Sequence, residues 1–174
     1  MNKMYHIILI LIVVAGCVGV DQAAKLVARR VLVASAPISL LGGLVVFEYA
    51  ENAGAFMSLG ARLPVGVRMA LWIGFVGVVL GVGLVYLACA NDLGRRQALA
   101  LACVIGGGGG NLVDRIVNHG AVIDYVSVGL GRLRTGVLNI ADLFVTFGVV
   151  VSVWLMVRSA KQQKTRCQNT GSPG

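Results

Sequence analysis

Four long apolar stretches, separated by segments that hold most of the charged residues, form the main pattern along this chain. They cover approximately residues 4–20, 69–90, 98–112 and 138–157. The second stretch has about the twenty apolar residues that a helix needs to cross a bilayer. The third is short and rich in glycine, so neighbouring helices must shield it from lipid. We therefore predict an all-α integral membrane protein with four transmembrane helices.

The first apolar stretch allows a second interpretation. Lys3, the apolar residues after it and the sequence Val14-Ala15-Gly16-Cys17 resemble a cleavable signal peptide that ends before a lipid-accepting cysteine. However, the apolar run continues past Cys17, and three more apolar stretches follow it. These two features favour a transmembrane helix that is retained.

The segment between the first two spans contains an apolar region at residues 40–49, rich in leucine, valine and aromatic residues. This composition, with Gly42-Gly43 as a turn, predicts one or two short strands. A small β-sheet of this kind would lie at the outer membrane surface, either as a cradle for an apolar substrate or simply as a packed element. The polar residues 162–174 are predicted to form a disordered cytoplasmic tail behind a single membrane domain at residues 1–161.

The overall composition agrees with a membrane protein. Of the 174 residues, 57% are hydrophobic and 13% are charged, and the mean hydropathy is +0.86. A soluble domain has about a quarter of its residues charged. The net charge of +8 would suit nucleic-acid binding, but the basic residues are scattered and only 6% of the residues are aromatic, which argues against that class.

The distribution of basic residues predicts an orientation in the membrane. Four spans place both chain termini on the same side. The short segments on that side are dense in basic residues, namely Lys3, Arg95, Arg96, Arg158, Lys161, Lys164 and Arg166. Because basic density marks the cytoplasmic side, both termini are predicted to be cytoplasmic.

The acidic residues gather on the opposite, outer side. Six of the seven fall there, namely Asp21, Glu48, Glu51, Asp114, Asp124 and Asp142, and the seventh is Asp92. A carboxylate in or beside an apolar span is costly, so it indicates a functional site by default. Asp124 and Asp142 are the strongest candidates because both lie against apolar runs. The simpler interpretation is that each caps the start of a helix by accepting backbone hydrogen bonds.

Helical spacing groups polar residues near the outer ends of the spans, because positions i, i+3 and i+4 share a face. Asn111, Asp114 and Arg115 are therefore predicted to project together from the end of the third span. Asp114 and Arg115 are predicted to form a structural charge pair at that helix end. Asn139 and Asp142 share a face at the start of the fourth span in the same way.

Asp21 and Lys25 form an i,i+4 pair at the end of the first span. A surface ion pair and a supporting role in a site both fit this pair. In the predicted topology it reaches the same membrane face as the ends of the third and fourth spans. Polar residues that are distant in sequence are thus expected to be neighbours in space.

Two neighbouring carboxylates cannot both ionise easily, so they share a proton and one acts as base while the other acts as acid. An aspartic protease activates water in this way. A serine hydrolase is disfavoured because His6 and His119 are the only histidines and no serine has a nucleophile-elbow setting. A metalloprotease is disfavoured because the chain lacks histidine clusters and has too few acidic residues free. Water activation by two carboxylates needs no cofactor, so none is expected. The glycine run 106–110 lacks the lysine and hydroxyl residue of a phosphate loop and predicts close helix packing.

Five motifs in this order resemble the lipoprotein signal peptidases (signal peptidase II). They are Asp21-Gln22-x-x-Lys25, Asn52-Ala53-Gly54-Ala55-Phe56, Gly110-Asn111-Leu112-Val113-Asp114-Arg115, Val122-Ile123-Asp124-Tyr125 and Asn139-Ile140-Ala141-Asp142. Each motif is weak alone, but together they are specific and cover nearly all of the chain before residue 162. Ala24, Tyr125 and Leu138 differ from the residues common in that family, which affects details of substrate contact.

The resemblance implies an aspartic endopeptidase of the bacterial inner membrane. Such enzymes remove the signal peptides of prolipoproteins by cutting before the cysteine that carries diacylglycerol. The motifs imply Asp124 and Asp142 as the catalytic pair, near the outer face. The residues that the resemblance implies for lining or supporting the site are Asn52, Asn111, Arg115, Asn139, Asp21 and Asp114. The resemblance further implies modified prolipoproteins and membrane lipid as partners, a monomeric enzyme, and a substrate cover at residues 40–56.

Two other classes remain as alternatives. A small proton-coupled membrane transporter would also place carboxylates in a membrane. Carriers usually hold them near the midplane between repeated halves, whereas here the acids gather at one face and no repeat is visible. A scaffolding subunit without activity would leave the two aspartates unexplained.

Overall fold

The computed structural model describes residues 3–54, 62–90, 93–131 and 133–170. Four helices are long and apolar enough to cross a membrane. They are α1 (Lys3–Leu32), a continuous helix over Val65–Cys89, α4 (Arg95–Val117) and α5 (Ile140–Thr170). The second consists of α2 (Val65–Met69), a π-helical turn at Ala70–Phe75 and α3 (Val76–Cys89). The predicted four-helix membrane architecture is confirmed.

Two helices are longer than the hydrophobic pattern predicted. Helix α1 continues to Leu32 instead of ending near residue 20. Its polar residues Asp21 and Lys25 did not end the helix, because both side chains are buried and paired inside the protein. Helix α5 continues to Thr170, so the segment expected as a disordered tail is helical over most of its length. That segment is rich in lysine, glutamine and arginine, which are good helix formers.

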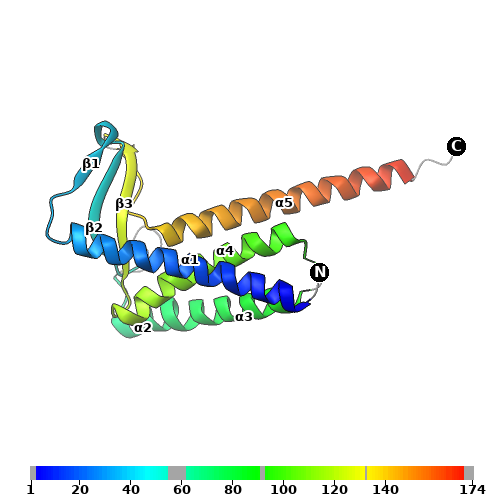
Figure 1. Ribbon diagram of the computed structural model, residues 1–174, viewed down its shortest axis with the longest axis horizontal. Coiled ribbons are helices and arrows are strands. Elements are labelled where there is room, and N and C mark those ends of the chain that lie inside the picture. Colours follow the sequence, from blue (N-terminus) through cyan, green and yellow to red (C-terminus); the bar gives the residue numbers. More distant parts are fainter. Residues whose placement is uncertain (1–2, 55–61, 91–92, 132, 171–174) are drawn as a thin grey trace.

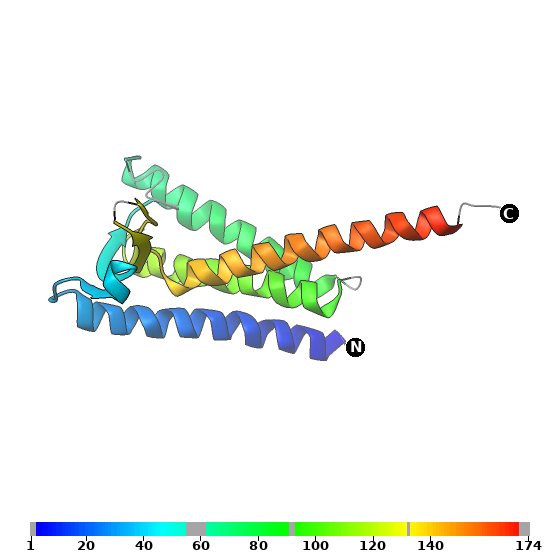
Figure 2. The ribbon, with the colours of Figure 1, turned by 90° about the horizontal axis from the view of Figure 1, so that it is seen from above.

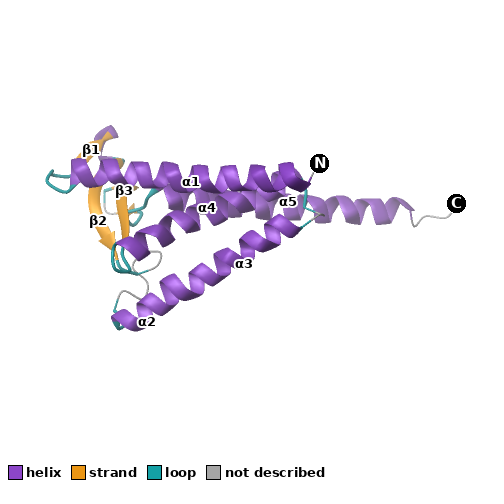
Figure 3. Cartoon of the chain, turned by 60° about the horizontal axis from the view of Figure 1, so that its bottom comes forward, coloured by secondary structure: helices purple, strands orange, loops and turns teal. Residues whose placement is uncertain are grey.

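Helix α4 lies at the centre of the bundle and packs against α1, α3 and α5. Figures 2 and 3 both show it between α1 and α3. The glycine run permits this contact: a Cβ atom on Gly107 would lie 2.5 Å from the carbonyl oxygen of Ala141 in α5, and one on Gly110 would lie 2.5 Å from Asp21 Oδ2 in α1. The prediction that the run serves close helix packing is confirmed.

A four-stranded antiparallel sheet covers one end of the bundle, with the strand order β1-β2-β3-β4. Its strands are β1 (Ile38–Leu40), β2 (Val45–Asn52), β3 (Val122–Leu130) and β4 (Leu133–Arg134). The strands run across the direction of the helices (Figure 1). The predicted strands around the Gly42-Gly43 turn are confirmed, and residues 55 and 56 of the predicted substrate cover lie outside the described residues.

The strands β3 and β4 were not predicted. The first four residues of β3 are all buried, so this strand lacks the alternation of apolar and polar residues that marks a half-exposed strand. It is buried because Ile123 and Tyr125 pack on Ala28 and Leu32 at the end of α1. As a result Asp124 lies in a strand, and the interpretation of Asp124 as a helix cap is wrong.

Candidate active site

Asp124 is held in place by two asparagine side chains from different elements. Asn52, at the end of β2, donates from Nδ2 to Asp124 Oδ2 at 3.1 Å. Asn139, just before α5, donates from Nδ2 to Asp124 Oδ1 at 2.6 Å. The side chain is almost fully buried, with 3% exposure. Both carboxylate oxygens are therefore fixed by neutral donors, so Asp124 has no neutralising cation in direct contact among the described residues.

Asp142 lies in the first turn of α5 and forms a reciprocal cap with Asn139. The Asp142 N–H donates to Asn139 Oδ1 at 2.9 Å, and the Asn139 N–H donates to Asp142 Oδ2 at 3.3 Å. This is the geometry of a capping box. The other oxygen, Oδ1, accepts from Asn111 Nδ2 at 2.9 Å. The capping interpretation of Asp142 is thus correct, yet the same carboxylate also faces the amide of α4.

A chain of amides connects the two carboxylates. Asn139, which contacts both aspartates, also donates from Nδ2 to Asn111 Oδ1 at 3.1 Å. Both aspartates, Asn52, Asn111 and Arg115 line one cavity of about 200 Å³, whose apolar wall includes Trp72, Val76, Val122, Val137 and Leu138. The predicted catalytic pair and three of the four predicted lining residues therefore surround one cavity. The fourth, Asn139, does not line the cavity but bonds to both aspartates.

A buried lysine lies directly behind this cavity. Lys25 Nζ is 2.7 Å from Asp21 Oδ2 and 2.9 Å from Asp114 Oδ2, and it donates to Asn111 Oδ1 at 2.9 Å. The exposures of the Lys25, Asp21 and Asp114 side chains are 2%, 0% and 2%. Because three acceptors surround the ammonium group, Lys25 fixes the orientation of the amide that contacts Asp142.

The two supporting carboxylates also hold the elements that carry the candidate catalytic pair. Asp21 Oδ1 accepts a hydrogen bond from the Ala141 N–H at 3.0 Å, at the start of α5. Asp114 Oδ2 accepts one from the Ile123 N–H at 2.9 Å, in the strand β3. Each of these backbone groups is one residue before a candidate catalytic aspartate. Asp21 and Asp114 thus position Asp142 and Asp124 through the backbone.

Two ion-pair predictions need correction. Asp21 and Lys25 do not form a surface pair, because both are buried against α4. Asp114 and Arg115 do not pair with each other; Asp114 pairs with Lys25, because adjacent residues on a helix point in different directions. Arg115 instead donates to the carbonyl oxygen of Asn111 at 3.2 Å and to that of Gly54 at 3.1 Å.

Arg115 places a positive charge on the wall of the cavity. Its contact with Gly54 joins α4 to the chain directly after β2. Its Nε atom is buried and has no hydrogen-bond partner in the part of the chain that the structure describes. The guanidinium therefore retains an unused donor next to the two aspartates.

The surroundings of Asp124 raise its pKa from 3.8 to about 6. Burial is the largest cause, since it disfavours the charged form. The negative charge of Asp142 acts in the same direction, while the hydrogen bonds from Asn52 and Asn139 and the charge of Lys25 oppose the rise. The site can therefore hold a proton on Asp124 at a pH where an ordinary aspartate has lost it.

Sequence reasoning missed three contributors to the site. Lys25 was considered only as half of a pair with Asp21, and Gln22 was not given a role. Gln22 Nε2 donates to Asp114 Oδ1 at 2.9 Å and to the Gly110 carbonyl oxygen at 3.1 Å. Trp72, which lies in the π-helical turn, lines the cavity. The signal for Lys25 was its i,i+4 spacing from Asp21, and the signal for Gln22 was its i,i+3 spacing from Lys25, whereas nothing in the sequence marked Trp72.

Tyr125, which differs from the common residue of the resembled family, has a role of its own. Its hydroxyl oxygen accepts a hydrogen bond from the Ile140 N–H at 3.3 Å, at the start of α5. It therefore connects β3 to the helix that carries Asp142.

Within the described ranges no group of three or more histidine, cysteine, aspartate or glutamate residues could hold a metal ion.

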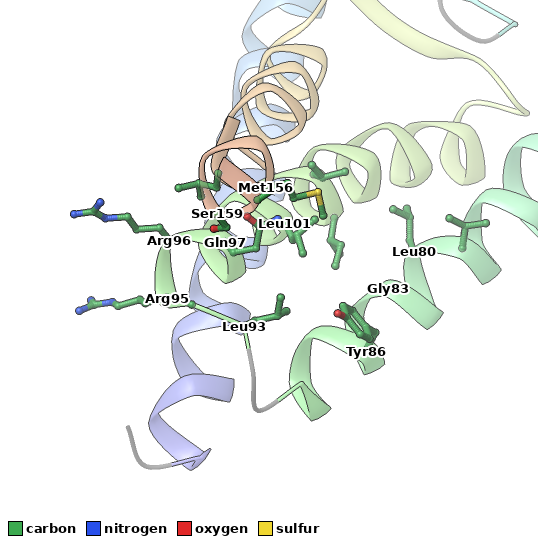
Figure 4. Close-up of a pocket in the computed structure, with 16 residues that line it drawn as sticks. Leu80, Gly83, Tyr86, Leu93, Arg95, Arg96, Gln97, Leu101, Met156 and Ser159 are labelled. Atoms are coloured by element: carbon green, nitrogen blue, oxygen red, sulfur yellow. The ribbon is translucent and has the colours of Figure 1, made fainter. Parts of the chain in front are cut away.

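A second and larger cavity, of about 1030 Å³, lies among α3, α4 and α5 towards the other end of the bundle. Its wall is mostly apolar and includes Leu80, Gly83, Leu101 and Met156, while Arg95 and Arg96 lie at its rim with their guanidinium groups pointing outward (Figure 4). Leu80 also packs against the position of Gly108, which lines the small cavity. The two cavities therefore follow the same face of α4.

Comparisons with known proteins were consistent with one another. Residues 11–158 match the family model described as Signal peptidase (SPase) II. The chain is 31% identical to a lipoprotein signal peptidase of Treponema denticola, with 95% of this chain and 99% of that protein covered. For lipoprotein signal peptidases of Geobacter sulfurreducens and Brucella ovis the identities are 32% and 36%, covering 87% and 79% of this chain and 92% and 82% of theirs.

Solved structures agree in fold. A bacterial membrane enzyme solved at 2.3 Å resolution superposes with a TM-score of 0.75 at 17% identity, covering 88% of this chain and 90% of that one. A second, solved at 1.9 Å, gives a TM-score of 0.70 at 17% identity, covering 84% and 91% of the two chains. The arrangement of four helices and a small sheet is thus one that solved membrane enzymes share.

Proposed function

The chain belongs to the signal peptidase (SPase) II family of bacterial membrane peptidases, and from that membership we propose that it removes signal peptides from prolipoproteins through an aspartic mechanism. The bond cut would be the one before a cysteine that carries diacylglycerol. The observation that carries the mechanism is the convergence of Asp124, from β3, and Asp142, from α5, on one cavity. The membrane is the bacterial inner membrane, with the active site near its outer face and both termini in the cytoplasm.

The two aspartates take different roles in this mechanism. Asp124 carries the shared proton, since its pKa is raised to about 6 and substrate binding would remove more water from it. Asp142 acts as the base, because its carboxylate lines the same cavity and accepts a hydrogen bond from the Asn111 amide. A water molecule between the carboxylates is the nucleophile.

The proton transfers balance over one cycle. Asp142 takes a proton from the water molecule while the water oxygen attacks the scissile carbonyl carbon. Asp124 gives its proton to the carbonyl oxygen. The resulting diol collapses when Asp142 returns its proton to the departing cysteine nitrogen and Asp124 recovers a proton from a hydroxyl group. The reaction needs no covalent intermediate, so positioning and charge stabilisation supply most of the rate.

Arg115 and the asparagines would position the substrate backbone. Arg115 lines the cavity and already donates to the carbonyl oxygen of Gly54. Asn52 and Asn139 hold Asp124, and Asn111 holds Asp142. A substrate strand that entered the cavity would meet the polar side chains of Asn52, Asn111 and Arg115 as well as the apolar wall formed by Trp72 and its neighbours.

The large apolar cavity would receive the signal helix of the substrate. A signal peptide contains an apolar segment of about 7–15 residues that remains in the bilayer. The cavity is lined by three spans (Figure 4). It follows the same face of α4 as the small cavity that holds the aspartates. A helix lying there would extend towards the aspartates at its outer end.

A cleavage assay tests this function directly. The purified chain, in detergent, is incubated with a diacylglyceryl-modified prolipoprotein, and the products are identified by mass spectrometry. The expected product begins at the lipidated cysteine, while the same precursor without the lipid remains uncut. If a substrate verified with another member of the family stays intact, the proposal is overturned and the transporter alternative returns.

The pH dependence should report the proton on Asp124. Because the protonated form is the active one, kcat/KM is expected to fall about tenfold per pH unit above the pKa of Asp124, which is about 6 in the free protein. The measurement is the initial rate of cleavage at low substrate concentration between about pH 4.5 and about pH 8, a range that spans this pKa. A rate that rises through this region would instead make Asp124 the base.

A variant at Asn52 separates this titration from general effects of pH. The Asn52 amide donates to Asp124 at 3.1 Å and lowers its pKa. Replacing it in Asn52→Leu should lower activity and also move the falling limb of the pH profile to higher pH. An unchanged limb would show that a group other than Asp124 controls it.

The proposed seat of the signal helix predicts a matched pair of glycine variants in α3. Gly83 lines the large cavity, and a Cβ atom there would make only an ordinary contact, 3.6 Å from Ile105 Cδ1. The side chain of Gly83→Val would occupy the seat and is expected to raise KM about tenfold, a loss of about 1.4 kcal/mol, with kcat little changed. Gly81→Val is the control, since no atom lies within 4 Å of its Cβ position. Equal KM values in both variants would exclude this cavity as the seat.

A further inference from the structure

The distal end of the β-sheet carries an exposed apolar cluster that the proposed function does not use. Its members, which we call the leucine tip, are Leu40, Leu41, Val128, Leu130 and Leu133, with exposures of 48%, 77%, 41%, 72% and 85%. We propose that the leucine tip is a lipid-binding anchor, inserted between the headgroups of the leaflet nearest the aspartates, and that it holds the sheet at a fixed height over the catalytic cavity.

Strand register brings the members of the tip together. Leu40 pairs with Val45 across β1 and β2, and Val45 pairs with Val128 across β2 and β3. Leu130 pairs with Leu133 across β3 and β4. The turn between β1 and β2 therefore lies beside the turn between β3 and β4, and the five side chains form one patch although they come from segments about 90 residues apart along the chain.

The position of the patch identifies lipid as its partner. The four spans define the direction across the membrane, and the strands run across that direction at the end where α4 finishes and α5 begins (Figure 1). The end of the sheet that carries β1 extends sideways beyond the helices in this view. A patch that extends sideways from the spans at the membrane surface lies over lipid rather than over protein.

The catalytic cavity cannot be what the tip contacts. The strand β2 begins at Val45 beside the tip and ends at Asn52 beside Asp124. Seven residue steps along a strand correspond to about 23 Å. The tip is therefore at the far end of the β2–β3 ribbon from the aspartates, and its leucines do not line the small cavity.

The backbone of the tip and a basic residue beside it support lipid as the partner. Leu41 has a φ angle of +52°, a conformation that is unfavourable for leucine, yet its side chain is exposed and adds nothing to the core. Arg134 connects the two turns by donating from Nη1 to the Gly43 carbonyl oxygen at 2.7 Å. Exposed leucines beside an arginine are typical of segments that lie in the headgroup region of a bilayer.

Photocrosslinking in a bilayer tests the anchor without requiring cleavage. The full chain, with p-benzoylphenylalanine in place of Leu133, is placed in nanodiscs of phosphatidylethanolamine and phosphatidylglycerol and irradiated. Mass spectrometry is expected to show a phospholipid adduct. The control carries the same group in place of Glu51, an exposed residue at the other end of β2, and should give at least about fivefold less adduct. No lipid adduct at 133, or a crosslink to a second copy of the chain, would overturn the proposal.

The role of the leucine tip in holding the sheet at a fixed height rests on the proposed function. It is tested separately, by the rate of cleavage. The double variant Leu130→Ser and Leu133→Ser changes two exposed side chains outside the predicted substrate cover. It is expected to cleave normally in detergent micelles, where no flat surface fixes the sheet, and about fivefold more slowly in nanodiscs. Equal rates of cleavage by this variant in micelles and in nanodiscs would show that the leucine tip does not set the height of the sheet. If the wild-type chain cleaves nothing, the crosslinking result still decides whether the tip binds lipid, so the two failures are distinguishable.

Discussion

Replacing either Asp124 or Asp142 by asparagine is expected to lower kcat/KM for a lipidated prolipoprotein by about 10³- to 10⁴-fold. Loss of one positioned acid or base costs roughly 10²- to 10⁴-fold, and the upper part applies here because the two carboxylates must share one proton. Asparagine preserves the size of each side chain. The measurement is the initial rate of cleavage by purified protein in detergent, with folding checked by thermal unfolding.

The matched control for these variants is Glu51→Gln. Glu51 belongs to the same strand as Asn52, but it is exposed and accepts a hydrogen bond from Tyr49 instead of facing the cavity. It should retain activity within about twofold, as expected of a surface substitution. If one of the two aspartate variants cleaves at a rate close to wild type, the paired mechanism is wrong, and a single-carboxylate mechanism must replace it.

The second large effect is expected on stability, from Lys25→Met. This change leaves Asp21 and Asp114, with exposures of 0% and 2%, buried without the ammonium group that lies 2.7 and 2.9 Å from them. Removing one partner of a buried charge pair costs about 3–5 kcal/mol. We expect a clear fall in the midpoint of thermal unfolding in detergent, accompanied by loss of activity because Asn111 also loses its contact with Lys25.

Two further variants isolate the cause of that loss. Arg30→Met removes a basic side chain that is exposed near the end of the same helix, and it should leave the unfolding midpoint nearly unchanged. A triple variant, Asp21→Asn with Lys25→Met and Asp114→Asn, removes all three charges and should recover part of the stability lost in Lys25→Met. A triple variant less stable than Lys25→Met would show that charge burial is not the cause.

The site consists of two sets of contacts, an inner level around the two aspartates and an outer level around Lys25. The inner level holds Asp124 and Asp142 by neutral amide groups, an arrangement that is compatible with the proposed sharing of one proton. The outer level pairs Lys25 with Asp21 and Asp114 and fixes the backbone beside each candidate catalytic residue. Variants of the inner level should therefore affect chemistry more than folding, while variants of the outer level should affect both.

Much of the fold could be predicted from the sequence because a bilayer imposes strong and local constraints. A span needs a long apolar run whatever its neighbours are, so the four helices could be predicted from the local composition of the sequence. The glycine run in α4 was informative in the same way, since few other roles suit five consecutive glycines within a span. The ends of α1 and α5 were not predicted correctly. In α1, the polar residues Asp21 and Lys25 continue the helix because their side chains pair inside the protein.

By itself the sequence determined the membrane class, the number of spans and the identity of the candidate catalytic residues, because each depends on residue type and local spacing. Only the tertiary structure decided which charges meet: Lys25 pairs with both Asp21 and Asp114, and Arg115 contacts Gly54 instead of Asp114. It also placed Asp124 in a buried strand, where its pKa rises to about 6. These properties depend on distances between segments far apart in the chain, and no local pattern encodes such distances.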